Sequence, residues 1–292
     1  MTIAKSQHKK LNCGGKILDL SAPSIMGVLN ITPDSFSDGG QFFNGDKVDR
    51  DKVLASVETM ISQGADIIDL GGESTRPGAK PVSVQQELDR VIPVLELLSA
   101  NHDSIYSVDT STPEVMREAA KAGANLINDV RALQRQGALL AAAKTGLPVC
   151  LMHMQNQPQT MQDNPQYQDV VREVIEFLDH SKQQALTAGI QQDQILLDPG
   201  FGFGKTLEHN LALFNGLERL AEKNHPIVVG LSRKSMIGQL IDADVNDRII
   251  GSVTMAVLAA QKIYRVGGTS ILRVHDVKQT KQALTIWQKV DQ

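Results

Sequence analysis

The sequence predicts an α/β protein that folds as a single (β/α)8 TIM barrel. Eight short apolar runs rich in Ile, Val and Leu recur along the 292 residues. Stretches with helical periodicity lie between them, and the runs recur about every 35 residues, as in an eight-unit barrel. No linker rich in Pro, Ser or Gly divides the chain. We therefore expect one domain over residues 1–292, with the barrel over about residues 25–290.

The predicted strands are continuous apolar runs, which is typical of a parallel sheet covered by helices. In chain order they are Ile25–Leu29, Ile67–Leu70, Ile105–Val108, Leu126–Ile127, Val149–Met152, Ile195–Leu197, Ile227–Val229 and Ile271–Val274. An open doubly wound sheet is the alternative fold. It would normally have fewer strands or a weakly apolar edge strand, and none of these runs is weakly apolar. The pattern therefore favours a closed barrel.

The predicted helices separate these strands, and several of them end at a glycine. They are Val53–Ser62, Glu87–Leu98, Pro113–Ala122, Val170–Ala188 and Ile249–Ala260. Gly64, Gly123 and Gly146 each precede a strand, as expected for glycines just past a helix. Ahead of the first strand, the segment Leu11–Leu20 contains two adjacent glycines. We expect it to form a hairpin that closes the bottom of the barrel.

Charge and composition exclude several classes of protein. With 29 Lys and Arg against 33 Asp and Glu, the net charge is −4, so no overall attraction to nucleic acid or an anionic membrane is expected. Two cysteines, Cys13 and Cys150, are too few for a disulfide framework. No apolar stretch reaches the roughly 18 residues of a membrane span. Residues 1–16 lack the apolar core of a secretory signal, so we expect a cytoplasmic protein.

Polar side chains end every predicted strand, where a TIM barrel holds its chemistry. In chain order they are Asn30, Asp69 with Glu73, Asp109, Asn128 with Asp129, His153, Asp198, Ser232 with Arg233 and Lys234, and Arg273 with His275. Helix capping explains single members such as Asp109 and Asp198. A structural role explains His153, between two methionines, equally well. Capping accounts poorly for all eight strand ends, so the pattern predicts a functional site.

Two long loops follow the first and second strands and are predicted to close over a ligand. Residues 30–43 and 71–79 are rich in Gly, Ser and Pro, a composition that suits lids. Five of the seven phenylalanines lie in the first loop or in the Gly-rich segment after the sixth strand: Phe36, Phe42, Phe43, Phe201 and Phe203. We expect these rings to enclose a flat aromatic substrate.

The segment Asp198–Thr206 looks like a phosphate-binding loop but matches no nucleotide motif. A Walker A loop needs glycine where Pro199 stands, and a dinucleotide fingerprint needs glycine where Lys205 stands. These departures exclude ATP and NAD. The glycines indicate that the backbone passes close to another group.

An anion site is predicted where the last two strands end. Arg273 and His275 point to the same side at strand spacing, and Ser232–Ser235 follow the seventh strand, where barrels often hold a phosphate. The sequence has no HExxH and no Cys/His spacing typical of a metal cluster. Mg²⁺ held by one side-chain oxygen, that of Asn30, together with substrate phosphates fits the sequence.

Seven motifs occur in order from about Ile25 to about Thr280. They are Met26–Phe36, Gly72–Gly78, Ser107–Thr110, Ile127–Asp129, Asp198–Lys205, Ser232–Ser235 and Arg273–Asp276. Together they resemble the dihydropteroate synthase family of bacterial folate synthesis, and the resemblance covers most of the chain. Residues 261–270 form a run a few residues longer than this family pattern leads us to expect.

The resemblance implies a reaction and the residues that carry it. 6-Hydroxymethyl-7,8-dihydropterin pyrophosphate and 4-aminobenzoate would give 7,8-dihydropteroate and pyrophosphate, with Mg²⁺ as cofactor. The implied pterin-binding residues are Asp109, Asn128, Met152, Asp198, Gly230, Lys234 and Arg273. The implied pyrophosphate-binding residues are Asn30, Arg76, Arg273 and His275, with Asn30 also the metal ligand.

The resemblance also assigns the second substrate and the chemical step. The implied 4-aminobenzoate-binding residues are Thr75, Pro77, Phe203, Lys234 and Ser235. The implied loop-closure residues are Asp34, Ser35 and Phe36, and the implied catalytic residues are Asp109, Lys234, Arg273 and His275. The arylamine nucleophile is neutral at pH 7, so no strong general base is needed. A loose, cation-like transition state at the pterin methylene carbon is expected.

The implied partners are small molecules and a second copy of the chain. Sulfonamides would compete with 4-aminobenzoate. A homodimer is expected, with late helices such as Ile249–Tyr264 as candidates for its interface, and no nucleic-acid or membrane partner is expected.

Two alternative functions are open. A pterin-binding methyltransferase of the same barrel superfamily would share the Asp/Asn pterin pocket but would not need the loop Ser74–Gly78, or Arg273 and His275, for a pyrophosphate. A catalytically silent pterin-binding subunit would have lost several loop residues, and none is lost here.

Overall fold

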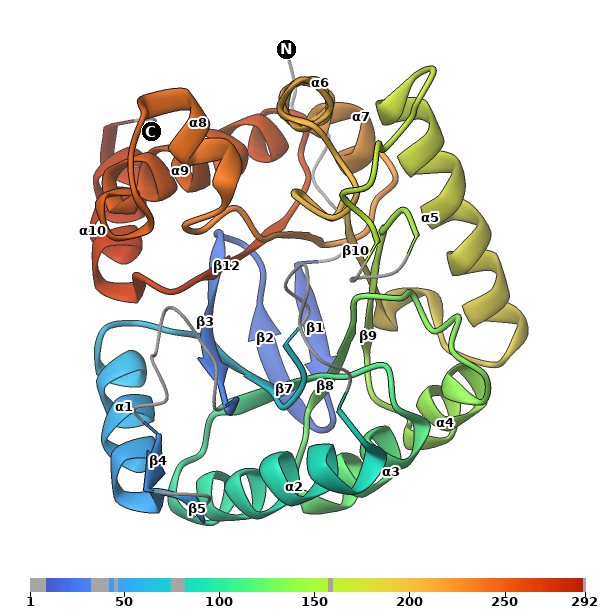
Figure 1. Cartoon of the computed structure of the whole chain (residues 1–292), viewed down its shortest axis with the longest axis vertical. Helices are drawn as coiled ribbons and strands as arrows, with labels where there is room; N and C mark the ends of the chain where they lie inside the picture. Colours follow the sequence, from blue (N-terminus) through green and yellow to red (C-terminus); the bar gives the residue numbers. More distant parts are fainter. Residues whose placement is uncertain (1–8, 33–41, 45–46, 75–81, 157–159, 291–292) are drawn as a thin grey trace.

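A computed structural model of the chain describes residues 9–32, 42–44, 47–74, 82–156 and 160–290. Within these residues, eight parallel strands close a barrel that helices surround, which confirms the predicted fold class (Figure 1). The strands are β3 (Ser24–Asn30), β6 (Ile67–Gly71), β7 (Ile105–Asp109), β8 (Leu126–Asp129), β9 (Val149–Met152), β10 (Ile195–Asp198), β11 (Ile227–Val229) and β12 (Ser270–Val274). Each strand pairs with its neighbours in chain order, and β12 pairs with β3 to close the barrel.

The helices lie on the outside of the barrel (Figure 1). They are α1 (Arg50–Ser62), α2 (Val84–Asn101), α3 (Pro113–Ala122), α4 (Ala138–Thr145), α5 (Val170–Thr187), α6 (Leu207–Asn215), α7 (Leu217–Ala221), α8 (Ser235–Ile241), α9 (Ile249–Arg265) and α10 (Val277–Val290). Gly123 and Gly146 cap α3 and α4 in the left-handed conformation, as the sequence predicts. Residues 261–265 continue α9 by more than one turn, so half of the run that looked long is helix.

The predicted hairpin is present and closes the bottom of the barrel. β1 (Lys10–Cys13) and β2 (Lys16–Asp19) pair antiparallel around Gly14 and Gly15, whose φ angles are +60° and +95°. Leu11, Leu18 and other hairpin side chains form one buried cluster with the first ring of side chains inside the barrel. This first ring consists of Met26, Ile67, Ile105, Leu126, Cys150, Leu196, Val228 and Ile271. Both cysteines therefore lie in an apolar plug, and burial raises the pKa of Cys13 to about 12.

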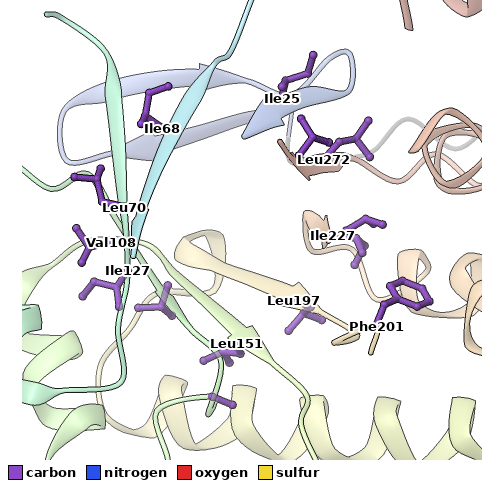
Figure 2. Close-up of a cluster of buried hydrophobic side chains, with 14 of the residues drawn as sticks. Ile25, Ile68, Leu70, Val108, Ile127, Leu151, Leu197, Phe201, Ile227 and Leu272 are labelled. Carbon is purple, nitrogen blue, oxygen red and sulfur yellow. The ribbon is translucent and has the colours of Figure 1, made fainter. Parts of the chain in front are cut away.

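Side chains alternate between the inside and the outside of the barrel, because successive residues of a strand point to opposite faces. The outward set packs against the helices in the main hydrophobic cluster (Figure 2). It includes Ile25, Ile68, Leu70, Val108, Ile127, Leu151, Leu197, Ile227 and Leu272. The alternation therefore leaves the inward positions above the first ring free for other chemistry.

Two smaller features complete the described residues. β4 (Phe43–Asn44) and β5 (Lys47–Val48) pair antiparallel just before α1. Among the helices that the structure describes, none combines the length and the apolar character needed to cross a membrane.

Candidate active site

A second ring of inward-facing residues lies two positions beyond the first, towards the carboxyl ends of the strands. We call it the polar ring: Val28, Asp69, Ser107, Asn128, Met152, Asp198, Gly230 and Arg273. Asp69, Asn128 and Asp198 are at most 5% exposed. Buried charged groups are rare unless they are paired, so this ring marks the part of the barrel interior that is not built for packing alone.

Arg273 lies between two carboxylates of the barrel interior. Its Nε donates to Asp69 Oδ2 at 2.7 Å, and its Nη2 donates to Asp109 Oδ2 at 3.0 Å. Burial alone would lower the pKa of Arg273, but the two carboxylates more than offset this and raise it. Burial also raises the pKa of Asp109, while the charge of Arg273 opposes that rise. The three residues form one charge network, in which Asp69 is buried and the other two are partly buried.

Asp198 and Lys234 form the opposite side of the site. Asp198 Oδ1 accepts from the Gly200 amide at 2.7 Å, which fixes the carboxylate at the end of β10. Burial raises the pKa of Asp198, and Lys234 opposes this. Burial lowers the pKa of Lys234 to about 8, and Asp198 opposes this. The Lys234 ammonium donates to the Phe201 carbonyl and lies 4.6 Å from the centroid of the Phe203 ring.

The remaining predicted pterin residues lie beside these groups. Met152 is 4% exposed in the polar ring, and Asn128 Nδ2 donates to Asp69 Oδ2 at 3.2 Å. A Cβ at Gly230 would lie 3.8 Å from Lys234 Nζ and 4.0 Å from Arg273 Cβ. Gly230 therefore leaves space in front of both cations.

The glycine-rich segment after β10 wraps around the side chain of Lys205. Lys205 Nζ lies 2.8 Å from the Gly200 carbonyl, 3.0 Å from the Phe203 carbonyl and 2.9 Å from His153 Nδ1. An ammonium group has three N–H donors, which matches these three acceptors. Burial lowers the pKa of His153 to about 2, so its ring is neutral and can accept. His153 is therefore a structural residue, which was one of its two predicted roles.

Two expectations about aromatic rings are wrong for the described residues. Phe201 is 0% exposed and packs in the main hydrophobic cluster, 6.3 Å between ring centroids from Phe214. Phe42 is buried in the same cluster. Their positions in the sequence suggested substrate contact, but both rings are buried in the main hydrophobic cluster. Phe203 remains beside Lys234.

The predicted anion site has fewer basic residues than the sequence suggests, because Arg233 pairs with a carboxylate outside it. His275 Nδ1 and its backbone amide both lie within hydrogen-bond reach of Ser232 Oγ, at 3.0 and 3.2 Å, so Ser232 orients the imidazole. Arg233, in contrast, donates from Nε to Asp276 Oδ2 at 3.0 Å. Arg233 therefore ties the end of β11 to the end of β12. Of the basic residues of the predicted anion site, Arg273, His275 and Lys234 therefore remain, and Lys234 and Arg273 both lie beside Gly230.

Asn30 and Ser235 lie at two edges of the site. A Cβ at Gly71 would lie 3.6 Å from Asn30 Oδ1 and 3.8 Å from Asp109 Cβ, so Asn30 and Asp109 are close neighbours across β6. Ser235 is the first residue of α8 and lines a cavity of about 330 Å³ together with Gln162, Thr206 and Met236.

Comparison with known proteins decides the family. The family model described as "Pterin binding enzyme" matches residues 26–275. The chain is 52% identical over 279 residues to the dihydropteroate synthase of Haemophilus influenzae, covering 96% of this chain and 98% of the relative. It is 53% identical over 280 residues to that of Escherichia coli K12, covering 95% of each. The chain belongs to the dihydropteroate synthase family. It is an enzyme of the transferase class.

Solved structures of the family have the same fold. A Yersinia pestis dihydropteroate synthase in complex with a sulfonamide drug superposes with a TM-score of 0.91 at 51% identity, covering 97% of this chain and 99% of that one. A Xanthomonas albilineans dihydropteroate synthase with 4-aminobenzoic acid gives 0.88 at 47% identity, covering 98% and 99%. The same enzyme with 7,8-dihydropteroate gives 0.84 at 44% identity, covering 97% and 98%. These likenesses confirm the predicted resemblance.

Six predicted site residues lie outside the described residues. They are Asp34, Ser35 and Phe36 of the first loop, and Thr75, Arg76 and Pro77 of the second.

Sequence reasoning assigned no role to two residues that the structure places in or behind the site. Asp69 was noted as a polar strand end, but only the three-dimensional pairing with Arg273, 204 residues away, reveals its contact. Its inward position was nonetheless predictable, because it stands two residues after the buried Ile67. Lys205 was weighed as part of a nucleotide motif, and no pattern in the sequence indicates that its ammonium would turn inward.

Proposed function

We propose that this enzyme condenses 6-hydroxymethyl-7,8-dihydropterin pyrophosphate with 4-aminobenzoate to give 7,8-dihydropteroate and pyrophosphate. The observation that carries the proposal is the set of Asp109, Asn128, Asp198, Lys234 and Arg273 at the carboxyl end of the barrel, of which Asn128 and Asp198 are buried and the others partly buried. It lies in a chain about half identical to known dihydropteroate synthases. A methyltransferase is disfavoured because these relatives match nearly the whole chain.

The pterin would lie against the polar ring. The Asp198 carboxylate offers acceptors for the paired N–H donors of a 2-amino-pyrimidinone edge, and such charge-assisted bonds are strong in a buried site. Asp109 and Asn128 would bind the far edge of the ring system, with Lys234 donating to it. Arg273 would cover its face. Met152 and Gly230 complete the wall, since Gly230 has no side chain to fill the space before the two cations.

The pyrophosphate would bind at Arg273 and His275, together with Asn30 and Arg76. Among the described residues no group of three or more His, Cys, Asp or Glu could hold a metal ion. A single amide oxygen, that of Asn30, is the donor that suits Mg²⁺ when phosphate oxygens supply the other ligands. The residues therefore fit a magnesium ion that binds with the pyrophosphate. When bound, it would neutralise charge on the leaving group.

The second substrate would enter at the outer side of Lys234. Phe203 offers a ring face beside the ammonium, and Ser235 lies at the cavity near the start of α8. We propose that these residues, with Thr75 and Pro77, hold 4-aminobenzoate, and that Asp34, Ser35 and Phe36 close over both substrates. The related Yersinia pestis enzyme was solved with a sulfonamide drug, and we propose that sulfonamides compete with 4-aminobenzoate here.

The chemical step needs orientation and charge stabilisation more than proton abstraction. The arylamine nitrogen is neutral and forms the new C–N bond at the pterin methylene carbon as the C–O bond to pyrophosphate breaks. The amine then loses one proton. Arg273 and His275 would stabilise the negative charge of the departing pyrophosphate. The Asp109 carboxylate would lie near the pterin ring that carries the methylene carbon, where positive charge develops. Closure of the site excludes water, which would otherwise compete with the amine.

The decisive experiment is product formation by the purified protein. We expect 7,8-dihydropteroate, detected by liquid chromatography, only when both substrates and Mg²⁺ are present, and its loss on addition of EDTA. Asp198→Asn should abolish most of this activity. Asp66→Asn is the matched control, because Asp66 accepts from the Ile25 amide at 2.7 Å at the opposite end of the barrel. No product above background from the wild-type protein would refute the proposed function.

We further propose that the enzyme is a homodimer that pairs through α8 and α9. Ile250 and Leu258, eight residues apart on α9, are 81% and 42% exposed, and Leu240 and Ile241 on α8 are 45% and 49% exposed. Residues at that spacing share one face of a helix. The predicted interface helix Ile249–Tyr264 lies within α9 and carries two of these four residues.

A further inference from the structure

Asp69 is a carboxylate that no ligand assignment uses, although it is the most buried charged residue of the polar ring. It is 0% exposed, so it can act only through its neighbours. Its Oδ2 atom accepts from Arg273 Nε at 2.7 Å and from Asn128 Nδ2 at 3.2 Å. A single oxygen therefore contacts two of the residues proposed to bind the pterin.

The barrel order explains how one side chain reaches both. β6 stands between β3 and β7, and the next strands outward are β12, which carries Arg273, and β8, which carries Asn128. The residues paired in register with Asp69 on the two intervening strands are Val28 and Ser107. These side chains are short, so Asp69, Arg273 and Asn128 can meet across the barrel interior.

We propose that Asp69 is a positioning residue that sets the orientation of Arg273 and of Asn128 for the pterin substrate. This inference rests on the proposed function. A guanidinium group is planar, and its Nε and Nη2 donors lie on one edge. Asp69 takes Nε and Asp109 takes Nη2, so both carboxylates occupy this edge. Neither of these two contacts uses Nη1, so we assign Nη1 to an incoming anion.

The same contact fixes the amide of Asn128. Its Nδ2 donates to a carboxylate, so rotating the amide by 180° would place Oδ1 against Asp69 Oδ2, and two acceptors would then face each other. Asp69 therefore selects one orientation, in which Asn128 Oδ1 is the acceptor held away from Asp69. An aspartate is needed for the two tasks together, because it attracts the charge of Arg273 and accepts from both donors.

Asp69 also keeps Arg273 from pairing with Asp109 alone. Both carboxylates share the charge of the guanidinium in the observed structure. Without Asp69, Asp109 would be the remaining carboxylate partner within hydrogen-bond reach among the described residues, and Arg273 would turn towards it. That pairing would occupy the Asp109 oxygens that we assign to the pterin, so loss of Asp69 should weaken pterin binding before it affects 4-aminobenzoate.

The test compares Asp69→Asn and Asp69→Ala with Asp129→Asn. Asp129 is also 0% exposed and follows Asn128 directly, but it points to the outside of the barrel. There it accepts from the Arg131 amide at 2.8 Å and the Leu133 amide at 2.9 Å. All three variants remove a buried charge and should lose stability in urea, so stability alone does not separate the roles.

Steady-state kinetics distinguish a positioning role from a purely structural one. For Asp69→Asn, which keeps an acceptor oxygen, we expect the KM for the pterin pyrophosphate to rise about ten-fold, and for Asp69→Ala by more. The KM for 4-aminobenzoate should stay within about two-fold. Asp129→Asn should change the KM for the pterin pyrophosphate much less than the Asp69 variants do. The positioning role is refuted if the Asp69 variants keep the wild-type KM for the pterin pyrophosphate, or if Asp129→Asn raises it equally. Absence of product from the wild-type enzyme would instead refute the proposed function.

Discussion

Gly200 is the residue where a single methyl group should distort the Asp198 side of the candidate site. Its φ angle is +67°, and an added Cβ would lie 1.8 Å from the His153 carbonyl oxygen. A side chain in the left-handed region costs about 1–2 kcal/mol. Backbone atoms cannot rotate away as a side chain could, so the clash adds roughly 1–3 kcal/mol of overpacking strain. We therefore expect Gly200→Ala to lose about 2–5 kcal/mol of unfolding free energy.

The matched control is Gly146→Ala. Gly146 has a φ angle of +70°, and an added Cβ would meet nothing within 4 Å. It therefore carries the same backbone penalty without the clash. Urea unfolding of both variants, followed by circular dichroism, gives the difference directly if the slope of the transition is unchanged. We expect Gly200→Ala to be less stable than Gly146→Ala by about 1–3 kcal/mol, which is the contribution of the clash.

Activity provides a second measurement on the same pair. Relief of the clash must move residues 199–204 away from β9, and the Gly200 amide holds Asp198 Oδ1 at 2.7 Å. The Gly200 carbonyl also accepts from Lys205 at 2.8 Å. We expect the KM for the pterin pyrophosphate to rise in Gly200→Ala and to be unchanged in Gly146→Ala. Equal stability losses in the two variants would refute the reasoning, because the clash would then cost nothing.

Two further predictions concern acid stability and assembly. The folded-state pKa of His153 is about 2 and its unfolded value is about 6.5, so the unfolded chain binds the extra proton between these values. The free energy of unfolding should therefore fall as the pH drops below about 6.5, by at most about 1.4 kcal/mol per pH unit. Between pH 7 and pH 5, the urea midpoint of His153→Asn should fall less than that of the wild-type protein. An equal fall in both proteins would contradict this prediction. Ile250 is 81% exposed on the proposed interface, so Ile250→Glu should give monomers in sedimentation equilibrium. Ile17 is 58% exposed on the hairpin, so the control Ile17→Glu should stay dimeric. A dimeric Ile250→Glu would place the interface elsewhere.

The strand pattern alone predicted the barrel that the structure shows, and it is also what assigns the candidate site to the carboxyl ends of the strands. Continuous apolar runs such as Ile195–Leu197 stand at the observed strands because burial on both faces leaves no polar position within them. The inward positions near their carboxyl ends, including Asp198 and Arg273, follow from a period of two residues. The Gly-Gly turn likewise predicted the hairpin over residues 11–20, since both glycines adopt positive φ angles.

Contacts between distant side chains could not be predicted in this way. Arg233 stands between Ser232 and Lys234 in the sequence, yet its backbone adopts a φ angle of +57° and its guanidinium pairs with Asp276. Phe201 and Phe203 are two residues apart, but one is fully buried in the core and the other lies beside Lys234. Such outcomes depend on local backbone turns and on partners from other strands, neither of which has a periodic signature.

The first ring of the barrel interior contributes to stability, whereas the polar ring carries groups that packing does not require. The first ring is apolar and sealed by the hairpin, so it contributes burial without any polar cost. The polar ring and its rim place Asp69, Asp109 and Asp198 around Arg273 and Lys234, three carboxylates against two cations. Taking such charges out of water is unfavourable even when they are paired, so packing does not explain them. Charged groups held in fixed positions suit the proposed reaction, because preorganised charge stabilises the charge that develops in a transition state.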